Sequence, residues 1–276
     1  MRFTFATPPA LLSTLALLSA LAFLASPALA CGPDTDCTVS GDRTYRLYVP
    51  DTDGPVGAFF YAHGYRGSAD GAMGNQALRA MADRLGMAFI AMNADADDWN
   101  LAHRPQAPDQ TEAAEYDYVT AVIEDVASRI DLDQTRMIAT GFSAGGMMTW
   151  TLACAMGDRF AGFIPYSGTF WQSAPATCPT PAADLVHIHG ERDTVVPMEG
   201  RAIAGTRQGN VYDVMSMYAD FGQQGAAVLQ EMPEGLTCFT RENAAGTILD
   251  LCMFDGGHSF SAARVEWAIE RILSRL

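Results

Sequence analysis

The hydrophobic residues of this chain are grouped into short continuous runs, separated by longer segments with helical spacing. A short apolar run bounded by turn residues is typical of a strand that is buried on both faces. Strands are predicted at residues 44–49, 56–62, 87–92, 136–140, 163–166, 185–188 and 247–254. Helices are predicted at residues 75–85, 112–130, from 144 onward, 212–221 and 265–276.

Strands that alternate with helices predict an α/β fold, in which a mostly parallel sheet is covered by helices on both faces. In sheets of this kind, ligands bind at the carboxyl ends of the strands. We therefore expect the polar loops that follow Ala62, Met92, Thr140, Ile188 and Phe254 to meet at one edge of the sheet.

Residues 1–30 have the pattern of a secretory signal peptide: a basic start, an apolar run over 10–24, and the small residues Ala28-Leu-Ala30 at the end. The apolar run is short for a membrane span, so no stable membrane insertion is expected after cleavage. One domain is then predicted over residues 31–276, in a secreted or periplasmic protein. The alternative is a lipid anchor on Cys31, because lipidation needs a cysteine directly after the cleavage site.

Composition narrows the class of partner. Hydrophobic residues make up 49% of the chain, which argues against intrinsic disorder. There are 17 basic and 32 acidic residues, and the resulting net charge of −15 disfavours nucleic acid and anionic surfaces as partners.

The six cysteines fall into three local pairs. These are Cys31 with Cys37, Cys154 with Cys178, and Cys238 with Cys252. Because the protein is predicted to be exported, disulfides are the leading interpretation of these cysteines. Zinc binding is the rival interpretation, but the sequence has no tight Cys-x-x-Cys pair. Six cysteines allow fifteen connectivities, so this pairing is a hypothesis. A disulfide at Cys31 would exclude a lipid there.

A candidate nucleophile stands in Gly141-Phe-Ser143-Ala-Gly145, between a predicted strand and a predicted helix. On such a turn the serine hydroxyl points out of the sheet, and the flanking glycines avoid a clash with neighbouring backbone. A serine hydroxyl needs a base to remove its proton and a third group to orient that base.

His258 and Asp193 are the candidate base and acid. His258 follows the last predicted strand in a glycine-containing loop, and Asp193 follows an earlier one. The chain order Ser143, Asp193, His258 is that of α/β-hydrolases. His258 could instead cap the last helix, and Asp193 could be an ordinary turn residue. Asp255 is the reserve candidate for the acid. Asp184 precedes its predicted strand, so it should lie at the wrong end of the sheet.

The oxyanion of an acyl-transfer reaction needs donors placed in advance. We expect these to be the backbone N–H of Ala144, directly after the nucleophile, and that of Tyr65, in the loop after an early strand. His63 fits a structural role in this loop better than the role of a base, which would break the chain order.

His187 and His189 lie two apart on a predicted strand and near Asp193, so their side chains face the same side and a metal site is conceivable. No third histidine is near in sequence, and neither a metal nor a cofactor is predicted. Three aromatic residues in the predicted loops are candidates for the rim of the substrate site. They are Trp99, Phe170 and Trp171.

Taken together, these segments resemble the polyhydroxybutyrate depolymerase and feruloyl esterase family of secreted bacterial α/β-hydrolases. The matching pieces are His63–Ser68, Asp98–Asn100, Gly141–Met148, Ser167–Thr169, His187–Pro197 and Gly256–Ser259. The resemblance implies an α/β-hydrolase fold with Ser143 as nucleophile, Asp193 as acid and His258 as base.

The resemblance also favours a Cys31–Cys37 bridge over lipidation. It departs from the family at Ala144, where asparagine is frequent, but a backbone donor survives that change. The implied activity is that of an exported serine carboxylesterase with an acyl-enzyme intermediate, acting on hydroxyalkanoate oligomers or related polyesters. Feruloyl or acetyl-xylan ester hydrolysis is the alternative; a peptidase and a catalytically silent binding protein are the further hypotheses.

Overall fold

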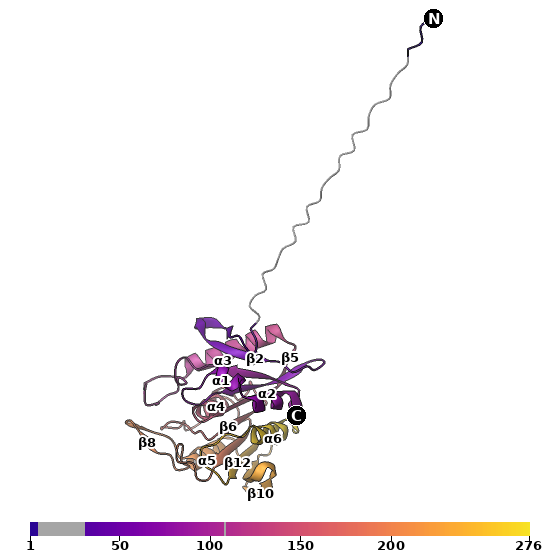
Figure 1. The fold of residues 1–276 in the computed structure, drawn as a ribbon. Helices are drawn as coiled ribbons and strands as arrows, with labels where there is room; N and C mark the ends of the chain where they lie inside the picture. The colour runs from indigo at the N-terminus through magenta and orange to yellow at the C-terminus, as the bar shows by residue number, and fades with distance from the viewer. Residues whose placement is uncertain (5–30, 108) are drawn as a thin grey trace. The chain divides into compact units, whose positions relative to one another are not determined.

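A ten-stranded sheet organises residues 31–276 in the computed structural model, which describes residues 1–4, 31–107 and 109–276 (Figure 1). The predicted signal peptide lies almost entirely outside the described residues. The strands of the sheet are β1 (Cys37–Thr38), β2 (Thr44–Tyr48), β3 (Val56–Ala62), β4 (Met87–Met92), β5 (Leu132–Phe142), β6 (Gly162–Tyr166), β7 (Asp184–Gly190), β10 (Val228–Met232), β11 (Leu236–Glu242) and β12 (Ile248–Phe254). A separate hairpin consists of β8 (Ala202–Ile203) and β9 (Thr206–Arg207).

The strands lie in the order β1-β2-β4-β3-β5-β6-β7-β12-β11-β10. The central strands from β4 to β12 are parallel, and the two strands at each edge are antiparallel. The helices are α1 (Ala69–Met73), α2 (Gln76–Leu85), α3 (Ala113–Arg129), α4 (Ala144–Ala155), α5 (Val211–Phe221) and α6 (Ala262–Leu273), with 3₁₀ turns at Ser40–Asp42 and Pro233–Gly235. The α/β prediction is confirmed, with a mixed sheet in place of a purely parallel one.

Each face of the sheet has its own apolar layer. Successive side chains of a strand point to opposite faces, and in β3 Phe60 packs into the layer under α3, α4 and α5, whereas Phe59 packs into the layer under α1, α2 and α6. Every residue of β3 is therefore buried, which explains its continuous apolar sequence. The carboxyl ends of these buried strands carry the loops of the candidate site.

The edge hairpin β10–β11 was not predicted from the sequence. It extends the sheet beyond β12, and Cys238 of β11 lies directly opposite Cys252 of β12. The disulfide between them joins two neighbouring strands.

All three predicted disulfides are present. They join Cys31 to Cys37, Cys154 to Cys178, and Cys238 to Cys252. Because the sulfur of Cys31 is bonded to Cys37, it is not available for a lipid, which argues against the lipid-anchor alternative.

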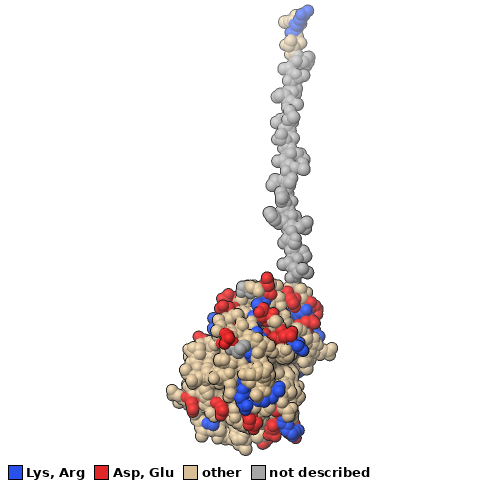
Figure 2. All heavy atoms as spheres, turned by 90° about the vertical axis from the view of Figure 1, so that its left-hand side faces the viewer, with Lys and Arg blue, Asp and Glu red and all other residues tan. Residues whose placement is uncertain are grey.

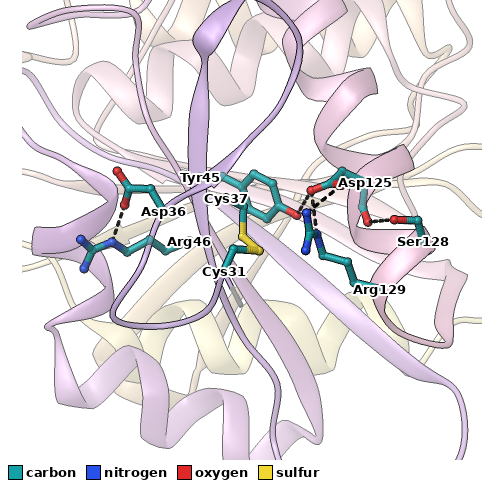
Figure 3. The surroundings of a disulfide bond; sticks show 8 residues. All are labelled: Cys31, Asp36, Cys37, Tyr45, Arg46, Asp125, Ser128 and Arg129. Atoms are coloured by element: carbon teal, nitrogen blue, oxygen red, sulfur yellow. Dashed lines mark hydrogen bonds and ion pairs between the residues drawn. A yellow bond between two sulfur atoms is a disulfide. The ribbon is translucent and has the colours of Figure 1, made fainter. Parts of the chain in front are cut away.

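The first disulfide lies beside a polar contact between β2 and α3 (Figure 3). The Tyr45 hydroxyl donates a hydrogen bond of 2.6 Å to the Asp125 carboxylate, which also accepts one of 2.8 Å from Arg129. The disulfide thus closes a short loop that ends on β1, whereas the Tyr45 hydrogen bond ties the neighbouring strand β2 to helix α3. Within the described residues, no helix has the length and apolarity needed to cross a membrane.

Candidate active site

Ser143 is the residue between β5 and α4, and its backbone has φ 60° and ψ −118°. A positive φ is costly for a residue with a Cβ and is maintained only where the surroundings enforce it. Here the enforcing contact is close backbone packing: a Cβ on Gly145 would overlap the Ala62 carbonyl at the end of β3. The Gly-x-Ser-x-Gly pattern is therefore required by the packing of the turn.

The structure brings the three predicted catalytic side chains into one hydrogen-bonded line. His258 Nε2 lies 2.9 Å from Ser143 Oγ, and His258 Nδ1 lies 2.6 Å from Asp193 Oδ2. These residues lie after β5, β7 and β12, so three strands that are distant in sequence each deliver one group to the same edge of the sheet.

The Asp193 side chain is fully buried and is held by the chain that follows it. Its Oδ1 accepts hydrogen bonds from the backbone N–H groups of Val195 (2.8 Å) and Val196 (2.9 Å), while Oδ2 faces His258. Burial by itself raises the pKa of Asp193, but the hydrogen bonds from His258 and the two N–H groups outweigh it and lower the pKa. The carboxylate is thus kept ionised and oriented.

The two other candidate acids have different partners. Asp255 is exposed and pairs with Arg192. Asp184 is the first residue of β7 and therefore lies at the opposite edge of the sheet, where it accepts a hydrogen bond from the backbone N–H of Ile248. Neither carboxylate contacts His258 among the described residues.

The loop after β3 lies directly beside the nucleophile. A Cβ on Gly64 would lie 3.4 Å from the Cβ of Ser143, which places the next residue, Tyr65, at the site. Ala144 is the first residue of α4, so its N–H has no acceptor within the helix. Tyr65, Ala144 and Ser143 line the same cavity, and the oxyanion role of the two N–H groups stays a prediction.

His63 holds this loop against the loop after β4. Its Nδ1 lies 2.8 Å from the Gly64 carbonyl, and its Nε2 accepts a 3.2 Å hydrogen bond from the Ala94 N–H. Burial lowers the pKa of His63, so the ring is kept neutral with a proton on Nδ1.

Trp99 is a correction to the predicted rim. Its side chain is fully buried, its indole N–H donates a 2.8 Å hydrogen bond to the His63 carbonyl, and its ring packs on that of His63. Burial of an indole is favourable when its N–H has a hydrogen-bond partner and its ring has an aromatic neighbour, and Trp99 has both in the interior. Trp99 therefore supports the loop of Tyr65 from below.

A cavity of about 250 Å³ opens beside Ser143 and Ala144. Trp171 lines it, as predicted for the rim. Phe170 instead packs against Trp150 and lines a second cavity of about 340 Å³, which shares Met147 and Trp171 with the first. Figure 2, which faces the side of the β8–β9 hairpin, shows broad uncharged surface, with mostly acidic side chains above it and both basic and acidic side chains below it.

A family model described as phospholipase/carboxylesterase matches residues 95–217, a segment that contains both Ser143 and Asp193. This part of the chain is similar to the phospholipase/carboxylesterase family of α/β-hydrolases. The chain is 30% identical over 142 residues to a putative esterase NocK of Nocardia uniformis, a match covering 51% of this chain and 41% of that protein. It is 28% identical over 169 residues to a probable feruloyl esterase C of Aspergillus niger, with 57% of each chain covered.

The matches therefore span about half the length of these curated relatives. Among solved structures, the acetyl xylan esterase from Aspergillus awamori superposes with a TM-score of 0.64 at 16% identity, covering 85% of this chain and 98% of that enzyme. The Bacillus cereus carboxylesterase superposes with a TM-score of 0.57 at 10% identity, covering 86% and 96%. At these identities the superpositions show the α/β-hydrolase fold.

His187 and His189, two residues apart on β7, are hydrogen-bond partners of each other. His187 Nε2 lies 2.9 Å from His189 Nδ1, and the remaining ring nitrogens contact Trp150 and the Val196 carbonyl. All four ring nitrogens of the two histidines thus have protein partners.

Asp98 and Gln208 also line the cavity beside Ser143, although sequence reasoning gave neither a role. Asp98 could have been noticed, because it directly precedes Trp99 within a segment shared with the resembling family. Gln208 carries no signal, since its place depends on how the β8–β9 hairpin folds back over the site.

Proposed function

We propose that this hydrolase is a serine carboxylesterase that works through an acyl-enzyme on Ser143. The observation that carries the proposal is the continuous hydrogen-bonded line from Ser143 through His258 to Asp193, at the wall of a cavity. The ionised Asp193 holds His258 with its proton on Nδ1, which leaves Nε2 free to accept the serine proton.

The reaction then proceeds in two halves. His258 takes the proton from Ser143 as its oxygen attacks the ester carbonyl, and the oxyanion is held by the N–H groups of Ala144 and Tyr65. His258 returns the proton to the leaving alcohol. In the second half a water, deprotonated by His258, attacks the acyl-enzyme and releases the acid.

For the substrate, we propose a feruloyl or acetyl ester of a plant cell-wall polysaccharide. The support comes from the names of relatives: probable feruloyl esterase C in Aspergillus niger and the acetyl xylan esterase from Aspergillus awamori. Hydroxybutyrate oligomers, the substrate favoured by the sequence interpretation, receive no support from these relatives.

We further propose that the protein is exported. Three disulfides within one domain are typical of an oxidising compartment, and the signal-peptide pattern of residues 1–30 predicts the same route.

The test compares the purified protein with its Ser143→Ala variant on 4-nitrophenyl acetate, methyl ferulate, acetylated xylan and hydroxybutyrate oligomers. The variant should lose at least about 10⁴-fold in kcat, while Ser216→Ala, an exposed serine on α5, should behave as wild type. Hydrolysis by Ser143→Ala at the wild-type rate would reject the proposal. Failure of a fluorophosphonate probe to label Ser143 would favour the catalytically silent alternative.

A further inference from the structure

The cavity beside Ser143 has a mostly apolar wall that contains two buried polar side chains. Its apolar residues are Pro105, Met147, Trp171, Val195, Val196 and Ile203. Gln208 is 3% exposed and Asp98 is 7% exposed, yet both line the cavity. Buried polar groups in an apolar site are costly unless something hydrogen-bonds to them.

The carboxamide of Gln208 is incompletely satisfied. Its Oε1 is buried and has no hydrogen-bond partner among residues 31–107 and 109–276. Leaving such a group unpaired costs about 1–3 kcal/mol, and an unpaired group in a native structure calls for an explanation. A ligand in the cavity that Gln208 lines would supply the missing partner.

The backbone holds Gln208 in place on both sides. Its N–H donates a 3.0 Å hydrogen bond to the Arg201 carbonyl, and it forms an antiparallel bridge with Trp171. The next residue, Gly209, donates a 2.7 Å hydrogen bond to the Phe170 carbonyl. The amide is therefore held at the cavity wall by a hairpin that is fastened to the segment carrying Trp171.

Asp98 is anchored in a similar way from the loop after β4. Its Oδ1 accepts a 2.9 Å hydrogen bond from the Trp99 N–H, and within the described part of the chain Oδ2 has no hydrogen bond. Trp99 in turn is fixed to the His63 carbonyl. Burial raises the pKa of Asp98, an effect opposed by the Trp99 hydrogen bond and the charge of Arg104.

We propose that Gln208 and Asp98 select esters that carry a free hydroxyl group, which they bind by hydrogen bonds beside the reacting carbonyl. A hydroxyl both donates and accepts, so it fits the acceptor oxygens of Asp98 and either orientation of the Gln208 amide. This inference rests on the proposed function, and it assigns specificity residues to that same site.

Three kinds of ester present such a hydroxyl: a hydroxyacyl chain, a phenolic acyl group and a sugar alcohol. Matched pairs that differ by the hydroxyl distinguish them. They are ethyl 3-hydroxybutyrate against ethyl butyrate, methyl ferulate against methyl 3,4-dimethoxycinnamate, and monoacetylated methyl xyloside against cyclohexyl acetate. For each pair the ratio of kcat/KM, hydroxyl ester over its partner, is measured.

The wild-type ratio should exceed one in at least one pair, and that pair identifies the source of the hydroxyl. Gln208→Leu, which keeps the volume and removes the amide, should lower this ratio about tenfold, the size expected for one hydrogen bond to a buried group. Asp98→Asn should lower it as well. Gln230→Leu, the same change on the exposed strand β10, should leave it unchanged.

A wild-type ratio near one in all three pairs, or a ratio unaffected by Gln208→Leu, would overturn the inference. In either case hydrolysis of 4-nitrophenyl acetate that is lost in Ser143→Ala would still support the proposed esterase. Loss of that Ser143 dependence would reject both.

Discussion

The ring nitrogens His187 Nε2 and His189 Nδ1 lie 2.9 Å apart, in a part of the core where neither side chain is exposed. Trp150 donates its indole N–H to His187 Nδ1 at 3.1 Å, so His187 carries its proton on Nε2 and donates to His189. His189 then donates from its own Nε2 to the Val196 carbonyl at 2.8 Å. The whole series is satisfied when both rings are neutral, and it ends on the loop that holds Asp193.

This arrangement predicts a loss of stability in acid. Burial, together with the neighbouring His189 ring, lowers the pKa of His187 well below 6.5. Burial also lowers the pKa of His189, although the hydrogen bond to the Val196 carbonyl and the charge of Asp193 raise it. Below pH 6.5 the unfolded chain therefore binds protons that the folded chain does not, and the free energy of unfolding falls as the pH falls. Urea denaturation at pH 7.5, 6.5 and 5.5 measures this slope.

The double variant His187→Gln/His189→Gln serves as the comparison. It should be less stable at pH 7.5 but should show a smaller decrease towards pH 5.5. His103→Asn, which changes an exposed histidine, should retain the wild-type slope. Equal slopes in the wild type and the double variant would contradict the assignment.

Asp193 and Asp255 offer a matched pair for identifying the acid. Asp193→Asn should lower kcat by about 10²–10⁴-fold, because an amide neither keeps the proton of His258 on Nδ1 nor stabilises the imidazolium that forms during the reaction. Asp255→Asn, three residues before His258 but paired with exposed Arg192, should leave kcat close to wild type. Initial rates on 4-nitrophenyl acetate provide the measurement, and a larger loss in Asp255→Asn would reverse the assignment.

The parts of the fold that could be predicted are those whose sequence pattern reflects burial. Strands β3 and β4 are continuous apolar runs because both faces are covered. Strands β7 and β12 are mostly apolar, with His187, His189 and Asp250 as buried interruptions, and all four strands are predicted from the sequence. The hairpin β10–β11 was missed because β10 is an edge strand in which the adjacent Val228 and Leu229 are both exposed, so neither alternation nor a buried run marks it.

The candidate site divides in the same way. Ser143, Asp193 and His258 were recognisable because each follows a predicted strand and their order is characteristic. Trp99 was misplaced because an aromatic residue in a loop fits either rim or core, and the choice depends on its indole partner, the His63 carbonyl. Gln208 depends on long-range pairing of the hairpin with Trp171, which no local pattern encodes.

The close packing at the nucleophile turn predicts that Gly145→Ala is destabilising. The added Cβ would overlap the Ala62 carbonyl, a backbone atom of β3 that cannot move aside alone. Overpacking of this kind costs about 1–3 kcal/mol, and the shift of Ser143 should lower kcat as well. Gly71→Ala in α1 is the control, since its Cβ would meet only the Ser68 hydroxyl, at 3.4 Å. A fully stable and active Gly145→Ala protein would show that the turn tolerates a Cβ.

The hydrogen bond from Trp99 to the His63 carbonyl predicts that a change of Trp99 lowers kcat, although Trp99 does not line the cavity beside Ser143. Trp99→Phe keeps most of the buried ring but removes the donor to the His63 carbonyl, leaving that carbonyl unpaired beside the Tyr65 loop. We expect kcat to fall about tenfold, with a smaller change in KM, because in the proposed mechanism the Tyr65 N–H binds the oxyanion of the transition state more strongly than the carbonyl of the bound ester. Trp267→Phe on α6, a half-buried tryptophan on the other face of the sheet, should leave kcat at the wild-type value. If Trp99→Phe raises KM while kcat is unchanged, Trp99 supports ester binding instead, and the oxyanion role of the Tyr65 loop loses its support.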